Sequence, residues 1–189
     1  MADRHDDLRV RADRVLDDAY ALPLDEIVDA RSAAPLSTAV EAWDVPAEDH
    51  AALQRWGLPE QIKEKFFENA PQDGAEPELS RSGRGLYRLG RFNRLTIGVE
   101  AGTGRVRALP RDPDKANIEF NHSLTRYIEC AWRWHSALPV LIELVNWAWD
   151  PDQLDFYEEK RQAVGRHIAA IDPDVASAAS SLWQSITDI

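Results

Sequence analysis

Side chains that commonly bind metal ions or transfer protons are thinly spread in this sequence. The five histidines are His5, His50, His122, His135 and His167. No two of them stand three or four residues apart, as zinc ligands on one helix face do, and no HExxH or Cys/His cluster occurs. His135 follows Ala131 on an apolar stripe, which favours a histidine packed at the edge of the core. The sequence therefore predicts no metal site.

Carboxylates are abundant, but acid–base chemistry requires carboxylates whose surroundings shift their pKa. Three Asp-Pro-Asp segments stand out, at residues 112–114, 150–152 and 172–174. An aspartate before proline commonly accepts a local backbone hydrogen bond, so each segment predicts a turn. The glycines form no phosphate-binding loop, and no GxSxG nucleophile motif is present. We predict no catalytic residue and no cofactor.

Several features of the sequence indicate the compartment. Cys130 is the single cysteine, so an internal disulfide is impossible and a reducing environment is expected. Its place on the apolar face of a predicted helix indicates an inert, buried thiol. The first residues are charged and do not resemble a signal peptide, and the longest apolar stretch, residues 137–148, is too short to span a bilayer. We expect a cytoplasmic protein that contacts no membrane.

Two Trp-x-Trp pairs, Trp132/Trp134 and Trp147/Trp149, lie in a predicted helical region. Residues two apart on a helix point about 200° apart, so one member of each pair should reach a boundary or the surface. Such a tryptophan either packs on a neighbouring loop or stands exposed as an anchor for a partner. Trp134 is our candidate for the exposed anchor.

Helical periodicity dominates both ends of the chain. The predicted helices cover residues 4–19, 47–56, 124–138, 140–148 and 153–170. Pro139 should end or kink the helix that Asn121 or Ser123 caps. Residues 24–31 fit a short helix or a partly extended segment. Asp172-Pro173 opens a terminal helix, which places Val175, Ala179, Leu182 and Ile186 on one side.

The middle of the chain changes to the two-residue period of strands. Strands are predicted over residues 86–92, 95–100, 105–109 and 118–120, and residues 68–85 are predicted to be a loop. Asn93-Arg94 and the segment 101–104 provide hairpin turns. The fold class is therefore α+β, a central antiparallel meander flanked by helices, with a helical C-terminal third.

Length and charge limit the possible functions. The 189 residues suffice for one domain with its own core, and we treat residues 1–189 as a single domain. Acidic residues outnumber basic ones by 33 to 22, giving a formal charge of −11. This charge repels phosphate backbones, which disfavours direct nucleic-acid binding. It suits either simple solubility or a basic protein partner.

Short motifs along the chain resemble a known family in their order and spacing. They are Leu53-x-x-Trp56-Gly57-Leu58-Pro59; Leu89-Gly90 followed by Leu95-x-Ile97-x-Val99 and Gly102-Thr103-Gly104-Arg105-Val106; Asn121-x-Ser123-Leu124-x-x-Tyr127-Ile128; and Asp172-Pro173 before Trp183. This arrangement, over residues 45–187, resembles the SUKH superfamily, in particular its fourth branch, the immunity proteins of actinobacterial polymorphic toxin systems. Tyr127 stands where that family usually has phenylalanine. Residues 1–44 form an N-terminal helical extension outside the resemblance.

The resemblance implies a non-enzymatic intracellular protein that binds and neutralises a cognate toxin, often a nuclease or a nucleic-acid deaminase. A basic toxin domain would complement the acidic chain. Two other classes remain open: a scaffold or regulatory module of the same fold, and an enzyme with a scattered active site. A toxin gene next to this one would favour the immunity protein over the scaffold. A pocket of hydrogen-bonded histidines and carboxylates would favour the enzyme.

The candidate partner-binding residues are six carboxylates in or beside predicted loops, together with one tryptophan. They are Asp73, Glu76, Glu78, Asp112, Asp114, Glu119 and Trp134. Each carboxylate either contacts the partner or belongs to an ordinary solvated loop.

Overall fold

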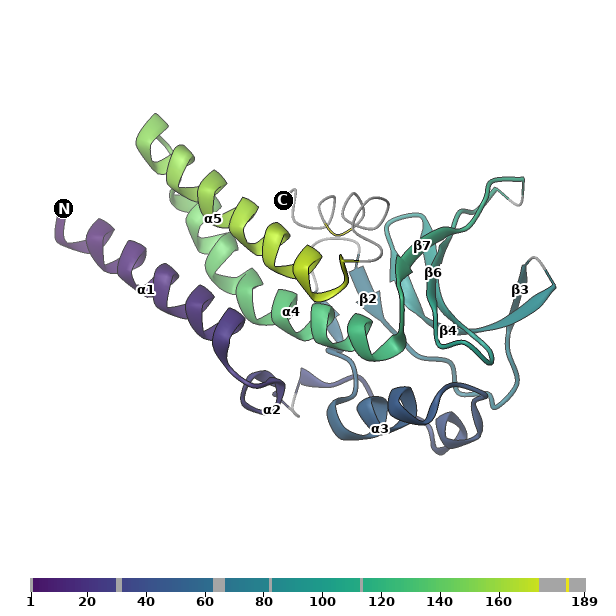
Figure 1. The fold of residues 1–189 in the computed structure, drawn as a ribbon. Helices are drawn as coiled ribbons and strands as arrows, with labels where there is room; N and C mark the ends of the chain where they lie inside the picture. Colours follow the sequence, from purple (N-terminus) through teal and green to yellow (C-terminus); the bar gives the residue numbers. More distant parts are fainter. Residues whose placement is uncertain are drawn as a thin grey trace.

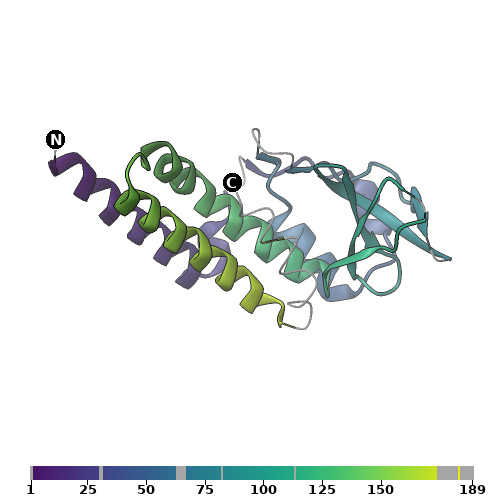
Figure 2. The same ribbon diagram turned by 90° about the horizontal axis from the view of Figure 1, so that it is seen from above.

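The computed structural model describes residues 2–29, 32–62, 67–81, 83–112, 114–173 and 183. An antiparallel sheet forms one end of the molecule, and three long helices extend away from it side by side (Figures 1 and 2). These helices are α1 (Ala2–Ala21), α4 (Leu124–Trp147) and α5 (Pro151–Ile171). The predicted α+β class and the helical last third are confirmed.

The described part of the sheet contains seven strands in the order β1-β2-β4-β5-β6-β7, and β3 pairs with β4. The strands are β1 (Gln61–Ile62), β2 (Phe67–Asn69), β3 (Leu79–Arg81), β4 (Arg84–Phe92), β5 (Leu95–Glu100), β6 (Val106–Leu109) and β7 (Ile118–Asn121). The predicted meander is confirmed as β4 to β7. The loop predicted over residues 68–85 is wrong in part, because β2, β3 and the start of β4 lie in it. These short strands are held by pairing with β4 rather than by an apolar pattern of their own.

The turns between the central strands use residues that tolerate positive φ. Asn93 has φ 52° in the β4–β5 turn, and Gly102 and Gly104 have φ 78° and 69° in the β5–β6 turn. Backbone of this kind favours glycine and asparagine, so both hairpins are confirmed at the predicted positions.

The helices begin and end close to their predicted limits. The shorter ones are α2 (Leu24–Ile27), the 3₁₀ helix η2 (Thr38–Ala42) and α3 (Ala47–Trp56). Ser123 caps α4 by accepting a hydrogen bond from the Arg126 N–H. Helix α4 does not end at Pro139 but continues to Trp147, since the residues around the proline are buried against neighbouring elements. The predicted terminal helix with Val175, Ala179, Leu182 and Ile186 lies outside the described residues.

Helix α4 is the centre of the core and contacts α1, α3, α5 and β7. Trp132 and Trp134 are only 0% and 2% exposed, so the prediction that one of them reaches the surface is wrong. A helix covered on several sides buries residues that point in opposite directions. The second pair behaves as predicted: Trp147 is half-buried, and Trp149 is 89% exposed.

Candidate partner-binding site

Motif residues from the middle and from the last part of the chain meet inside the fold. Asp172 Oδ2 accepts hydrogen bonds from Asn121 Nδ2 at 3.1 Å and from the His122 N–H at 2.7 Å. Asn121 Oδ1 in turn accepts one from Trp183 Nε1 at 3.2 Å. All but His122 are buried. These residues therefore join β7, the end of α5 and Trp183, and they face inward.

The Gly-Leu-Pro motif after α3 is also held by buried side chains. Trp132 Nε1 donates to the Gly57 carbonyl at 3.1 Å, and Asn69 Nδ2 donates to the Pro59 carbonyl at 2.9 Å. The Tyr127 hydroxyl donates to Asn69 Oδ1 at 2.7 Å, a bond that phenylalanine could not make. These motif residues therefore stabilise the scaffold.

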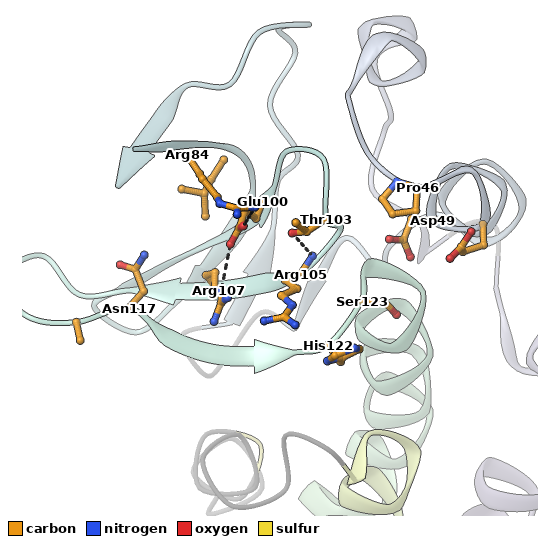
Figure 3. A pocket seen from close by; sticks show the side chains of 13 residues that line it. Pro46, Asp49, Arg84, Glu100, Thr103, Arg105, Arg107, Asn117, His122 and Ser123 are labelled. Atoms are coloured by element: carbon orange, nitrogen blue, oxygen red, sulfur yellow. Dashed lines mark hydrogen bonds and ion pairs between the residues drawn. The ribbon is translucent and has the colours of Figure 1, made fainter. Parts of the chain in front are cut away.

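A polar pocket of about 880 Å³ lies where the sheet meets α3 and the start of α4 (Figure 3). We call it the sheet-end pocket. Its lining comes from the start of α3, from β4 to β6 and their connections, and from the residues just before α4: Pro46, Glu48, Asp49, Arg84, Leu86, Glu100, Thr103, Arg105, Arg107, Ala116, Asn117, His122 and Ser123.

Alternating charges cross the strands in this pocket. Glu100 lies between Arg84 and Arg107, at 2.8 and 3.4 Å, as Figure 3 shows. Arg107 also contacts Glu119 at 3.3 Å, and Arg105 contacts the same carboxylate at 3.7 Å. The Glu100 and Arg107 side chains are mostly buried, at 12% and 20% exposure. These carboxylates pair with arginines, an arrangement that ties four strands together and balances charge locally.

Asp49 closes the side of the pocket next to α3. Its Oδ1 accepts hydrogen bonds from the Thr125 N–H and hydroxyl, both at 2.7 Å, so it supplies an anion to the positive end of α4. Its Oδ2 is buried against Gly104 and makes no hydrogen bond within the described residues. Burial raises the pKa of Asp49, and the bonds from Thr125 partly oppose that rise.

We expect the variant Asp49→Asn to gain stability relative to the parent chain as pH rises from about 4 to about 7. The folded-state pKa of Asp49 is raised, so its contribution to stability is complete below the unfolded-state pKa and is lost as pH rises through the folded-state value. Asparagine keeps an oxygen for Thr125 without a charge. Urea unfolding of both proteins at both pH values measures the change, and a pH-independent difference would contradict it.

The structure separates the predicted acidic residues into two kinds. Asp73 and Glu76 are exposed in the β2–β3 connection, and Asp112 and Asp114 are exposed in the β6–β7 connection. Glu78 pairs with Arg88 at 3.2 Å, and Glu119 belongs to the charge pairs of the sheet-end pocket. The charges of Glu78 and Glu119 are therefore partly compensated within the fold. Glu78 is exposed like the first four, so exposure separates only the half-buried Glu119 from the other five.

The tryptophan candidate is corrected. Trp134 is enclosed by the helices around α4 and cannot anchor a partner without unfolding. Trp149, which sequence reasoning did not select, is the exposed member of the Trp-x-Trp pairs. The signal that could have found it is the Asp150-Pro151 pair, because Trp149 follows the end of α4 and precedes the next helix.

Two further titratable side chains, Cys130 and His135, are buried or half-buried. Burial raises the pKa of the Cys130 thiol and lowers that of the half-buried His135. Across the described ranges, no group of three or more His, Cys, Asp or Glu side chains could hold a metal ion. No helix in those same ranges is both long and apolar enough to cross a membrane.

Comparison with known proteins gives one match. A family model described as SUKH-4 immunity protein matches residues 35–188, which include every motif quoted above and begin before α3. No curated protein sequence and no solved structure matches the chain.

Proposed function

Because this chain belongs to the SUKH-4 immunity protein family, whose function is immunity against a toxin, we propose that it neutralises a cognate toxin by binding and occluding it. The family match carries this proposal. The motif residues Asn121, Asp172 and Gly57 are engaged within the scaffold, so the toxin is bound mainly by exposed residues elsewhere on the surface. The complex forms in the cytoplasm.

Binding without catalysis is supported by the state of the polar groups. In the sheet-end pocket Glu100 is bound by arginines, and Ser123 accepts the capping bond of α4. The Cys130 thiol is fully buried, and its raised pKa disfavours the thiolate. These groups already have structural partners, so the surface and not a reactive centre provides the function.

The charge of the chain supports a basic toxin. The formal charge is −11, and Asp73, Glu76, Asp112 and Asp114 are exposed. A nuclease or a nucleic-acid deaminase must attract a polyanion, so its substrate-binding face is basic. An acidic inhibitor complements such a face and competes with the nucleic acid for it.

Charge reversal in the β2–β3 connection tests whether these acidic residues attract a basic toxin. We expect the variant D73K/E76K to associate with the toxin about tenfold more slowly at low salt, and with a weaker dependence on salt. The neutral variant D73N/E76Q should give an intermediate rate, because it removes the attraction without adding repulsion. Stopped-flow or surface plasmon resonance at several salt concentrations measures the association rate and its dependence on salt. Equal rates for the parent chain and both variants would contradict the proposal that these residues attract the toxin.

Co-expression tests the proposed function itself. The toxin gene beside this one is expressed alone and together with this chain, and growth is compared; we expect rescue and a complex on gel filtration. No rescue and no complex would exclude toxin neutralisation. If growth is rescued and mass spectrometry shows that the toxin is degraded or modified, the chain acts on the toxin as an enzyme and does not merely occlude it.

A further inference from the structure

Trp149 forms an exposed aromatic surface at the end of the molecule that lies away from the sheet. It is 89% exposed in the short connection between α4 and α5, at the same end as the start of α1 (Figures 1 and 2). Val10 and Leu154 are 68% and 48% exposed. Val10 lines with Trp149 a groove of about 1230 Å³. Asp152, Leu154 and Asp155 do not line this groove but are exposed at the start of α5, directly after the connection. We call these three residues, with Val10 and Trp149, the Trp149 surface.

The backbone that carries Trp149 is fixed before any partner arrives. The Trp149 N–H donates to Gln153 Oε1 at 2.9 Å, and the Gln153 N–H donates to Asp150 Oδ1 at 3.0 Å. The second bond caps α5 through Asp150, the first ties the residue before the cap to the same glutamine, and Pro151 is the first residue of α5. Because the backbone of this turn is already ordered, a partner that binds the indole has to order only the Trp149 side chain.

The groove beside Trp149 carries both signs of charge, since Asp7, Glu143 and Asp150 line it together with Arg11 and Arg14, and the start of α5 is acidic. Residues 134–159 contain no lysine or arginine but six acidic residues: Glu143, Asp150, Asp152, Asp155, Glu158 and Glu159. Glu143 pairs with Arg11, Glu158 with Arg161 and Glu159 with Lys160. Among the described residues, Asp152 and Asp155 form no ion pair and are exposed. Glu100 of the sheet-end pocket and the neighbouring Glu119, by contrast, pair with arginines.

Cations already stack on aromatic rings at this end of the helices. The Arg9 guanidinium lies 5.4 Å from the centre of the Trp147 ring and 5.0 Å from that of Phe156. The Lys160 ammonium lies 4.9 Å from the Phe156 ring. These distances are those of cation–π contacts. Trp149 presents the same chemistry to the outside.

From this exposure, preorganisation and charge, we infer that the Trp149 surface binds a cationic segment of the toxin. An arginine or lysine of the toxin stacks on the Trp149 indole, and Asp152 and Asp155 pair with neighbouring cations. The inference rests on the proposed function and specifies where the toxin is held. It assigns the aromatic anchor to the helical end, away from the sheet-end pocket.

The test measures binding of the full chain to the purified toxin, inactivated by mutation. Trp149→Ala should weaken affinity about 30-fold, mainly through faster dissociation, and Trp149→Phe should lose much less because it keeps an aromatic face. D152N/D155N should lower the association rate and its salt dependence. Gln54→Ala, an exposed change on α3, is the control and should bind like the parent chain.

A second arm needs no toxin. The ¹⁵N-labelled indole signal of Trp149, identified by its loss in Trp149→Phe, is followed while hexa-arginine or hexa-glutamate peptide is added. We expect the arginine peptide to shift it and the glutamate peptide not to.

The outcomes are separable. If the parent chain binds the toxin and Trp149→Ala binds equally well, the inference is overturned while the proposed function stands. If the parent chain neither binds nor protects, the proposed function fails first. A parent chain that sediments as a dimer and a Trp149→Ala variant that sediments as a monomer would identify the surface as a self-interface, which also overturns the inference. The urea midpoint of Trp149→Ala should match the parent, since the side chain is exposed.

Discussion

Gly90→Ala is expected to lower the free energy of unfolding by about 3 kcal/mol or more, at the upper end of what overpacking costs. A Cβ at position 90 would overlap the Glu68 carbonyl and lie 2.9 Å from the Asn69 Cα, and both are backbone atoms of the paired strand β2. Backbone cannot move aside as a flexible side chain can, so β2 must separate from β4. Urea unfolding, followed by tryptophan fluorescence, measures the loss.

The damage should extend beyond the strand pair. Asn69, the residue after Glu68 in β2, links Tyr127 of α4 to the Pro59 carbonyl. Displacing β2 therefore strains both hydrogen bonds. Gly74→Ala is the matched control, because its Cβ would meet only ordinary contacts of 3.7 and 3.8 Å. We expect that control to stay within about 0.5 kcal/mol of the parent. Equal stability of the two variants would mean that β2 does not approach Gly90 this closely.

Asp172→Ala is expected to cost about 2–3 kcal/mol, because it leaves two donors without their acceptor. Asp172 Oδ2 receives the Asn121 side-chain amide and the His122 backbone N–H, and the carboxylate is only 7% exposed. Asn121 also accepts from Trp183, so its orientation affects the position of that indole. Denaturation by urea gives the loss, and the midpoint should fall without a large change in slope.

The variant Asp172→Asn separates hydrogen bonding from packing. Asparagine presents an oxygen in place of Oδ2 and keeps the shape of the side chain, so we expect it to lose about 1 kcal/mol. An alanine variant as stable as the asparagine variant would show that the two hydrogen bonds contribute little. In neither variant should toxin binding change at temperatures where the protein is folded, because Asp172 lies inside the scaffold.

Local patterns were sufficient to predict most of the fold. The alternation of Leu95, Ile97 and Val99 and the positive-φ positions Asn93 and Gly102 depend only on neighbours in sequence, and the β4–β5–β6 meander was predicted from them. The strands β2 and β3 escaped prediction because their stability comes from pairing with β4, across intervening polar residues.

The candidate site was less predictable, because exposure and charge pairing are tertiary properties. The pair Trp147/Trp149 does have an exposed member, but Trp149 lies beyond the end of α4, so its position in the connection and not helical geometry exposes it. The helical rule failed for Trp132/Trp134, where neighbouring elements cover α4 on several sides. Likewise, Glu119 is acidic in sequence, yet it pairs with Arg107 on the adjacent strand β6 and with Arg105 just before that strand. Sequence gives the charge of a residue, and only the fold gives its partners.

The single thiol of the chain provides a built-in reporter of opening. Cys130 is fully enclosed, and its sulfur lies 3.7 Å from Asn121 Nδ2 and 3.9 Å from the Ile168 carbonyl, where β7, α4 and α5 meet. A thiol-specific reagent can reach it only in molecules whose junction has separated. The labelling rate under native conditions therefore follows the free energy of that separation, without an engineered probe and without denaturant.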